Sequence, residues 1–324
     1  MSGARPARRP RLLADVGGTN ARFAVQRPGE APTDLRVIAD DSFPTLAAAG
    51  EAYLEGLADT ERPRLAAFAV ASPVIGDHID MTNRAWSFSI EALRRALGLD
   101  ALYVVNDIEA VALAIPALEP RDRRQLGAGA AVPEAPVGVL APGTGLGTAT
   151  LIWHQGAPLA LASEGGHATM AAADDDEAAV LGWLRRHLGH VSAERVLSGQ
   201  GLINLHRALS ALAGTSDAPA LTAVEIGRHA IDGSDPQARA AVRLFSAMLG
   251  TFAGNLALTL GALGGIYIAG GVVPKLGAAF DVERFRARFE DKGRFQPYLA
   301  RIPTWLVTHE TPALLGLAAL LDRA

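Results

Sequence analysis

The sequence of 324 residues contains no cysteine. This absence excludes disulfide bonds, iron–sulfur clusters, thiolate zinc sites and cysteine nucleophiles, and it is consistent with a cytoplasmic protein. An excess of positive charge is also missing, because 34 acidic residues outnumber 30 basic ones and leave a formal net charge of -4. The charge therefore favours neither nucleic acid nor an anionic membrane as a partner.

Lysine is nearly absent and occurs only at Lys275 and Lys292. Neither lysine stands in the Gly-Lys-Ser/Thr context of a P-loop, and neither lies on an early strand as the lysine of protein kinases does. Any nucleotide phosphate therefore has to be bound without a Walker-type lysine.

Long apolar runs are not evident in the sequence. No run reaches the length that we expect of a membrane span, and no apolar signal-peptide region follows the first arginines. Residues 1–10 are expected to form a disordered basic tail.

Two segments that are present share one plan. Residues 12–25, LLADVGGTNARFAV, place an acid, two glycines and a threonine between two apolar runs that are typical of strands. Residues 137–153, VGVLAPGTGLGTATLIW, repeat the plan with another turn of glycine and threonine. Two such units about 125 residues apart predict a duplicated architecture with a cleft between its halves.

Strands alternate with helices along the chain, which predicts an α/β fold. Helices are predicted over residues 45–57, 89–97, 108–115, 174–188, 238–260 and 312–321, and buried strands over 65–70 and 102–105. A boundary near residues 116–120 would leave a small domain formed by 11–117 and 310–324 and a large domain formed by 118–309.

The glycine turns are candidates for phosphate binding. Glycine lets consecutive backbone amides face one point, and such turns bind phosphate oxygens without lysine. Thr19 and Thr144 add hydroxyl donors, and Asp15 could reach a hydrated Mg²⁺ that bridges the phosphates. The alternative is two ordinary tight hairpins, with Asp15 as a local turn former. Two such turns, each with a threonine, favour phosphate binding.

A dinucleotide-dependent oxidoreductase is a weaker alternative. The spacing Gly143-x-Gly145-x-Gly147 differs from the G-x-G-x-x-G fingerprint, and strand-type residues follow it where the fingerprint needs a helix.

Asn106 and Asp107 directly follow the strand expected over 102–105. Open α/β sheets bind their ligands at the carboxyl ends of strands, so Asp107 could accept a proton from a substrate hydroxyl. A helix N-cap for the helix expected over 108–115 is an equally strong interpretation of the same two residues.

Residues 164–167 are Glu-Gly-Gly-His. The two polar side chains stand on either side of a glycine pair that we expect to be flexible, which suits a hydroxyl-rich ligand. A lone histidine is more often structural, so a structural role is the alternative for His167.

His187, His190 and Glu194 resemble a metal-binding set only superficially. Gly189 interrupts the helix between the histidines and no further ligand is near, so a zinc site is not predicted. Glu194, followed by Arg195, is by itself typical of a charge pair on a helix surface.

Taken together, these motifs resemble the bacterial glucokinases of the proteobacterial type, within the actin–hexokinase–sugar-kinase superfamily. The matching segments are ADVGGTNARFAV, MTNRAWSFS, VVNDIEAVALAIP, APGTGLG, EGGHA, GHVSAERVLSG, AGNLALTLGALGG, IAGGVVP and FEDKGRF. They follow the family's order from residue 14 to about residue 295 and are jointly highly specific.

The resemblance implies a duplicated actin-like ATPase fold of two α/β domains around a central cleft, commonly as a homodimer. It implies the transfer of phosphate from ATP to D-glucose, giving D-glucose 6-phosphate for glycolysis, with Asp107 as the general base. The implied sugar ligands are Asn106, Asp107, Glu164, His167 and Glu194. The implied nucleotide-binding residues are Ala14, Asp15, Val16, Gly17, Gly18, Thr19, Gly143, Thr144, Gly270 and Gly271, with Asp15 directed at Mg²⁺. A sugar-sensing regulator without turnover is the main alternative.

Overall fold

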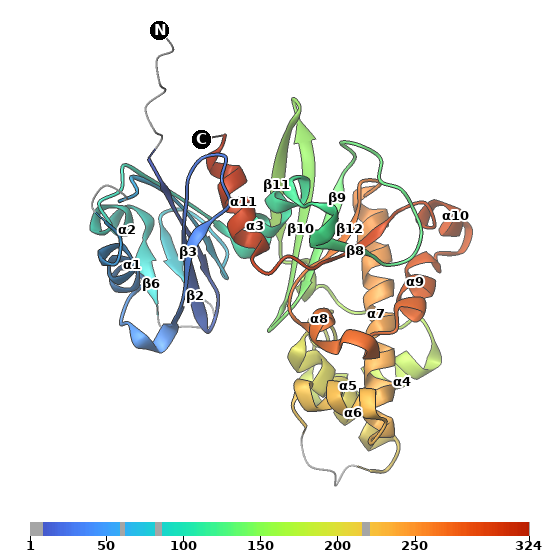
Figure 1. The fold of residues 1–324 in the computed structure, drawn as a ribbon. Coiled ribbons are helices and arrows are strands. Elements are labelled where there is room, and N and C mark those ends of the chain that lie inside the picture. Colours follow the sequence, from blue (N-terminus) through green and yellow to red (C-terminus); the bar gives the residue numbers. More distant parts are fainter. Residues whose placement is uncertain (1–8, 59–61, 82–85, 216–220, 324) are drawn as a thin grey trace. The chain divides into compact units, whose positions relative to one another are not determined.

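The structure, a computed structural model, describes residues 9–58, 62–81, 86–215 and 221–323 (Figure 1). Residues 1–8 of the expected tail and residues 82–85 of the MTNRAWSFS motif lie outside the described residues. The chain divides into two compact units: unit 1 comprises Met1–Leu118 and His309–Ala324, and unit 2 comprises Glu119–Thr308. The carboxyl-terminal segment therefore belongs to the unit in which the chain begins.

Unit 1 is built on a five-stranded sheet with the order β3-β2-β1-β4-β7. Its strands are β1 (Arg11–Val16), β2 (Asn20–Gln26), β3 (Thr33–Ala39), β4 (Leu65–Val70) and β7 (Ala101–Asn106), while β5 (His78–Asp80) and β6 (Ser87–Ser89) form a separate ribbon. β2 runs antiparallel to β1 and β3, β4 runs parallel to β1, and β7 runs parallel to β4. The carboxyl ends of β1, β4 and β7 therefore lie at one edge of the sheet.

Helices cover both faces of this sheet. They are α1 (Leu46–Glu55), α2 (Ile90–Ala96), α3 (Asp107–Ala114) and α11 (Pro312–Leu321), with the 3₁₀ helices η1 (Asp40–Ser42) and η3 (Ile115–Ala117). α1 and α2 pack over the face that carries Leu12, whereas α3 and α11 pack over the face that carries Leu13. Burial on both faces explains why residues 12–14 of β1 are apolar without alternation.

The two strands expected to be buried differ in the structure. β4 lies in the middle of the sheet and is buried, as predicted. β7 is only half-buried, and Tyr103 is 40% exposed. The prediction of a buried strand over 102–105 is therefore wrong, because β7 is an edge strand with a neighbour on one side only.

Unit 2 repeats the sheet of unit 1 and extends it. Its strands are β8 (Arg123–Gln125), β9 (Val137–Pro142), β10 (Leu146–His154), β11 (Ala157–Ser163), β12 (Gly265–Ile268) and β13 (Thr304–Val307), in the order β11-β10-β9-β12-β13-β8. The first five of these positions match β3-β2-β1-β4-β7 in order and in direction. This match confirms the predicted duplicated α/β architecture.

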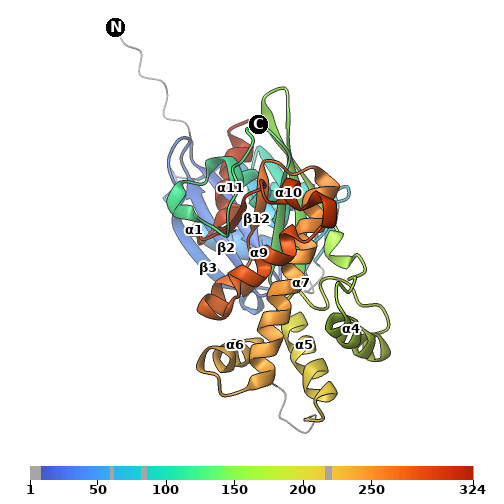
Figure 2. The ribbon, with the colours of Figure 1, turned by 90° about the vertical axis from the view of Figure 1, so that its right-hand side faces the viewer.

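The helices of unit 2 gather along one long helix, α7 (Figure 2). They are α4 (Asp175–Leu188), α5 (Gly199–Leu212), α6 (Ala223–Asp232), α7 (Pro236–Leu260), α8 (Val272–Leu276), α9 (Val282–Glu290) and α10 (Gln296–Leu299), with η4 (Pro120–Asp122), η5 (Gly165–His167), η6 (Gly277–Ala279) and η7 (Gly293–Phe295). α9 lies so close to α7 that a Cβ at Gly250 or Gly254 would collide with a carbonyl oxygen of α9. Glycine at these two positions permits the contact.

α7 also corrects an expectation. Among the described residues it is long and apolar enough, by length and composition alone, to cross a membrane, so the prediction that no apolar run reaches that length is wrong. The most apolar 18-residue window of α7 is 67% buried inside unit 2. Such burial is typical of the core helix of a globular unit.

The predicted helices begin where capping side chains stand. Ser89, Asp174 and Asp235 each accept a hydrogen bond from a backbone amide in the first turn of the following helix. The helices predicted over 89–97, 174–188 and 312–321 are confirmed as α2, α4 and α11. α7 begins two residues before the predicted start at 238, because proline suits the first position of a helix.

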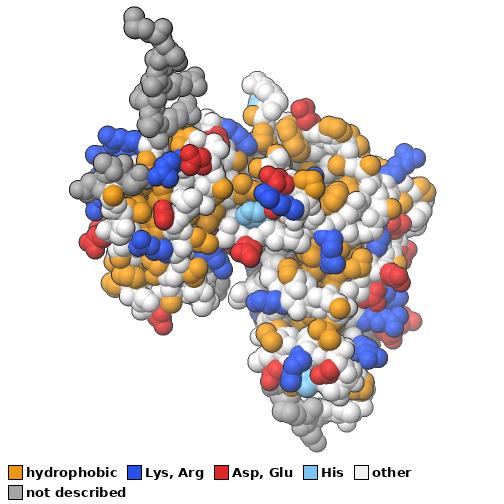
Figure 3. Space-filling view, in the orientation of Figure 1, with side chains coloured by type: hydrophobic (Ala, Val, Ile, Leu, Met, Phe, Trp, Pro, Cys, Tyr) orange, Lys and Arg blue, Asp and Glu red, His pale blue; other side chains and the backbone are white. Residues whose placement is uncertain are grey.

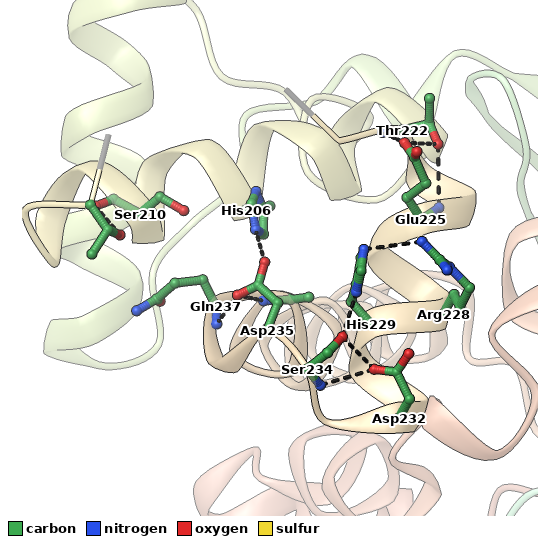
Figure 4. Close-up of polar contacts among 12 residues, drawn as sticks. His206, Ser210, Thr222, Glu225, Arg228, His229, Asp232, Ser234, Asp235 and Gln237 are labelled. Atoms are coloured by element: carbon green, nitrogen blue, oxygen red, sulfur yellow. Dashed lines mark hydrogen bonds and ion pairs between the residues drawn. The ribbon is translucent and has the colours of Figure 1, made fainter. Parts of the chain in front are cut away.

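A polar cluster joins α5, α6 and the beginning of α7 (Figure 4). His206 Nε2 lies 2.8 Å from Asp235 Oδ2, so the residue that caps α7 also pairs with a buried histidine of α5. Burial by itself raises the pKa of Asp235, but the hydrogen bonds from His206 and from the first amides of α7 lower it overall. Thr222 and Glu225 form a capping box at the start of α6. These side chains hold helix ends, which accounts for the cluster without a ligand.

Charged side chains of both signs lie beside one another on the visible face of each unit (Figure 3). This mixture agrees with the formal net charge of -4.

Candidate active site

Three parallel strands of unit 1 end side by side. Val16 of β1 is paired with Val70 of β4, and Val70 is paired with Asn106 of β7. The turn that begins at Gly17 and the residue Asp107 therefore lie at the same edge of one sheet. This is the edge at which open α/β sheets bind ligands.

Asp15 stands on β1 directly opposite Arg22 of β2. Arg22 Nη1 donates a hydrogen bond of 3.2 Å to Asp15 Oδ2. Burial raises the pKa of Asp15, and the charge and hydrogen bond of Arg22 partly oppose that rise. Our sequence reasoning missed Arg22, although the hairpin register predicts a cross-strand pair of opposite charges.

The first glycine turn is closed by one backbone hydrogen bond, from the amide of Gly17 to the carbonyl oxygen of Asn20 at 3.1 Å. Gly18 and Thr19 are exposed at its tip. The side chains of Ala14 and Val16 are fully buried in the core, so only their backbone can contact a ligand.

Asn106, not Asp107, caps helix α3. Asn106 Oδ1 accepts a hydrogen bond of 3.1 Å from the amide of Ile108, and Asn106 Nδ2 donates one of 3.2 Å to the carbonyl oxygen of Ser72. Glu109 bonds to the backbone of Asn106, and burial raises the pKa of Glu109. Asp107 is the first residue of α3, and its Oδ1 accepts from the Ile108 amide at 2.8 Å. The capping interpretation of this pair therefore applies mainly to Asn106.

The second glycine turn is held by other segments of unit 2. The amide of Gly143 donates to the carbonyl oxygen of Gly145 at 2.8 Å. The amide of Gly199, at the start of α5, donates to the carbonyl oxygen of Gly143 at 2.9 Å. Thr144 is exposed between them. The turn leads into strand β10, as predicted, and not into the helix that a dinucleotide fingerprint requires.

Gly270 and Gly271 lie beside this second turn. The amide of Ala269 donates to the carbonyl oxygen of Leu140 at 2.7 Å. Gly270 has a φ of +76°, and a Cβ there would stand 2.5 Å from the carbonyl oxygen of Pro142. Glycine is therefore required at this position by both conformation and space.

The segment Glu164–His167 packs against β10. The amide of Gly165 donates to Thr148 Oγ1 at 3.0 Å, and a Cβ at Gly166 would collide with the carbonyl oxygen of Leu146. The glycine pair is thus required by close packing, and the expectation of a flexible pair is wrong. The side chains of Glu164 and His167 are exposed, with Oε2 and Nε2 3.6 Å apart.

Glu194 lies in a turn before α5, so its interpretation as part of a helix surface is wrong. Glu194 Oε2 accepts a hydrogen bond of 2.9 Å from the amide of Leu146, and the Glu194 amide donates one of 2.9 Å to the carbonyl oxygen of Gly166. The structure thereby brings the second glycine turn, the Glu164–His167 segment and Glu194 together within unit 2. Our sequence reasoning missed Thr148 and Gly199, whose contacts span distant segments.

The glucokinase family model matches residues 12–324, which is nearly the whole chain. The chain is 54% identical over 315 residues to a glucokinase from Paramagnetospirillum magneticum, covering 95% of this chain and 96% of that protein. The chain belongs to the glucokinase family. The resemblance seen in the sequence motifs is thereby confirmed. The prediction that the chain is an ATP-dependent hexose kinase is confirmed with it.

Further comparisons agree with the glucokinase family. The crystal structure of a glucokinase from an Antarctic psychrotroph superposes with a TM-score of 0.88 at 36% identity, covering 97% of this chain and 99% of that one. The chain is also 53% identical over 313 residues to the bifunctional protein glk of Burkholderia thailandensis. The match includes 96% of this chain but only 48% of that relative.

No group of three or more His, Asp or Glu residues that could hold a metal ion is found among the residues described for this glucokinase-family chain. His187 stacks on Trp183, and His190 Nε2 lies 3.0 Å from Thr169 Oγ1.

Proposed function

We propose that this chain transfers the γ-phosphoryl group of ATP to the 6-hydroxyl of D-glucose, with Asp107 as the general base. The observation that carries the assignment of Asp107 is its position at the carboxyl edge of three parallel strands, beside a residue that already caps the helix. Because Asn106 already caps α3, a role of Asp107 as base is compatible with the start of this helix, and the end of a parallel strand supports a substrate hydroxyl beside it.

In the proposed reaction, Asp107 accepts the proton of the sugar 6-hydroxyl while that oxygen forms a bond to the γ-phosphorus. The bond between the γ-phosphorus and the β,γ-bridging oxygen breaks, and ADP leaves with the electron pair. Phosphoryl transfer of this kind needs little covalent chemistry from the protein, so positioning and charge stabilisation make the main contribution.

Asn106, Glu164, His167 and Glu194 are proposed to bind the sugar hydroxyls. Within unit 1, Asn106 uses one hydrogen of its side-chain amide and one lone pair of its side-chain oxygen. One amide hydrogen and one oxygen lone pair are left for a ligand. Glu164 and His167 are exposed side by side, and Glu194 retains Oε1. A set of carboxylate, amide and imidazole groups matches the alternating donors and acceptors of a hexose.

The backbone from Ala14 to Thr19 and the turn at Gly143 and Thr144 are proposed to bind the phosphates of ATP, with Gly270 and Gly271 beside the adenosine. Asp15 fits a nucleotide-bound Mg²⁺ through water, because Arg22 occupies only its Oδ2. When bound, Mg²⁺ would neutralise part of the charge on the phosphates. Asp15 itself would hold that ion near the turn.

The test is glucose-dependent release of ADP by the purified chain, measured in a coupled assay with a panel of hexoses and phosphoryl donors. We expect turnover with ATP and glucose. Binding of glucose without ADP release would reject the kinase assignment in favour of a sugar sensor, and binding of NAD(P)H instead of ATP would favour an oxidoreductase. A homodimer and a cytoplasmic location stay predictions of the family resemblance, and light scattering tests the first.

A further inference from the structure

We propose that Glu194 is a positioning residue that ties the second glycine turn to the Glu164–His167 segment and thereby couples nucleotide binding to sugar binding. This inference rests on the proposed function, because it uses the phosphate role of the turn and the sugar role of the segment.

The carboxylate of Glu194 holds the turn directly. Its Oε2 accepts a hydrogen bond of 2.9 Å from the amide of Leu146, across 48 residues of sequence. Leu146 is the first residue of β10 and stands opposite Pro142, the last residue of β9, in the β9–β10 register. The first ladder position after the turn is therefore completed by a side chain from a distant segment.

The space for this carboxylate is made by a glycine. A Cβ at Gly145 would collide with Glu194 Oε2, so a larger residue at position 145 would displace the carboxylate. Glycine is thus required at this position by the space that the Glu194 carboxylate occupies. A left-handed backbone is not the reason, because Gly145 is not one of the described glycines with a positive φ.

The backbone of Glu194 holds the other partner. Its amide donates to the carbonyl oxygen of Gly166 at 2.9 Å, and its carbonyl oxygen accepts from Ser198 Oγ at 2.8 Å. One residue therefore contacts the segment that carries His167, the turn that carries Thr144 and the start of α5. A shift of any one of these three elements moves the other two through bonded atoms.

The remaining oxygen, Oε1, makes no hydrogen bond with the described residues and the side chain is half-buried. A sugar hydroxyl bound to Oε1 would fix the carboxylate that holds Leu146, and a nucleotide that orders the turn would fix the same carboxylate for the sugar. Such coupling is reciprocal by thermodynamic necessity, so each ligand must raise the affinity for the other by the same factor.

The test compares Glu194→Ala, which removes the acceptor, with Glu194→Gln, which keeps an oxygen for the Leu146 amide. Arg195→Ala is the matched control, because Arg195 is an exposed neighbour whose side chain takes no part in the tie. Two quantities are measured on the full chain: hydrogen exchange of the amides of residues 143–147 without ligand, and the Kd of the Mg²⁺ complex of a β,γ-imido ATP analogue with and without glucose.

In Glu194→Ala we expect exchange at Leu146 to be faster by on the order of tenfold, as for the loss of a charge-assisted hydrogen bond. At glucose concentrations that saturate each variant, we expect glucose to tighten analogue binding at least about fivefold in the wild type and in Arg195→Ala, and to have no such effect in Glu194→Ala. Glu194→Gln should restore the slow exchange. A residue with a merely structural role would lower stability without changing the ratio of the two Kd values.

Wild-type exchange at residues 143–147 together with an unchanged Kd ratio in Glu194→Ala would overturn the proposal and leave Glu194 as a sugar ligand alone. The coupling would also be overturned if glucose did not lower the Kd of the ATP analogue in the wild type. Failure of the proposed function is distinguishable: a wild type that releases no ADP, with the exchange difference between variants intact, supports the tie and rejects the kinase assignment.

Discussion

The glycine turns of the two units share a strand topology but obtain their acid in different ways. In unit 1, Asp15 lies on β1 two residues before Gly17, and it is paired across the hairpin with Arg22. In unit 2, the position two residues before Gly143 is Ala141, and the carboxylate at the turn comes from Glu194, 48 residues from the amide that it holds. The two units therefore share the backbone of the turn but not the position in the sequence from which its carboxylate comes.

The two turns also differ in the hydrogen bonds and close contacts that hold them. Within unit 1 the first turn is closed by its own Gly17–Asn20 hydrogen bond and its tip is exposed. Within unit 2 the second turn is held by Gly199 and by Glu194 and stands against Gly270. The first turn is thus a local structure, whereas the second depends on tertiary contacts.

The largest effect is expected for the acid at the edge of unit 1. Asp107→Asn should lower kcat by roughly 10²–10⁴-fold, because asparagine cannot accept the proton. The fold should persist, since Asn106 and Glu109 hold the start of α3. Steady-state ADP release, with hexose and ATP affinity measured separately, tests this expectation.

Asn106 is also a proposed sugar ligand, so Asn106→Ala controls for stability alone: it should lower the free energy of unfolding by about 1 kcal/mol, whereas Asp107→Asn should leave that free energy near the wild-type value. Turnover of Asp107→Asn within a few-fold of the wild type would remove Asp107 from the role of base.

The acid on β1 should act on the nucleotide alone. Asp15→Ala is expected to weaken binding of Mg²⁺–ATP by about 1.5–3 kcal/mol, the usual contribution of a charged hydrogen-bonding group. Glucose affinity measured without nucleotide should stay near the wild-type value, and calorimetric titration of each ligand checks both. Loss of glucose binding with normal use of ATP would show that the first turn has been assigned to the wrong ligand.

Unit 2 should show the opposite selectivity at its exposed polar pair. Glu164→Gln and His167→Ala are each expected to weaken hexose binding by about 1–3 kcal/mol, because sugar hydroxyls would lose their partners. ATP affinity in the absence of sugar should hardly change. Unaltered hexose affinity and specificity in both variants would leave this pair as an ordinary surface contact.

The packing of the first glycine turn and of the Glu164–His167 segment predicts unequal tolerance of alanine. Gly166→Ala should lower the free energy of unfolding by about 1–3 kcal/mol, because the added Cβ collides with the Leu146 carbonyl oxygen. Gly17→Ala should cost less than about 1 kcal/mol, since its Cβ would stand 3.3 Å from the Asn20 carbonyl oxygen. Urea denaturation measures both, and equal losses would contradict the conclusion that close packing requires glycine at 166 but not at 17.

The smallest effect is a shift in pH dependence. Burial raises the pKa of Asp15 and Arg22 opposes that rise, so Arg22→Ala should raise the pKa further. Because the ionised carboxylate is the form that attracts Mg²⁺, the acid limb of kcat/KM for ATP should move to higher pH. Arg22→Lys keeps the charge and serves as the control. An unmoved limb, or one moved to lower pH, would separate Asp15 from nucleotide binding.

Much of the fold was accessible to prediction because it depends on neighbouring residues. The caps at Ser89 and Asp174 marked the starts of two helices, and the run over 65–70 marked a central strand. The run over 102–105 has a similar composition, yet it became a half-buried edge strand. Composition predicted that both segments are strands, but their positions in the sheet depend on which other strands pair with them.

The candidate site divides along the same line. The sequence by itself determined the two strand–turn–strand repeats, the acid on β1 and the acid after β7, because turn glycines, short apolar runs and polar residues at strand ends are local features. Only the tertiary structure decided that Asn106 caps α3, that Gly165 and Gly166 are a packing requirement, and that Glu194 completes the second turn. The physical reason is that these hydrogen bonds and close approaches join segments far apart in the chain, whose meeting depends on the packing of the whole unit.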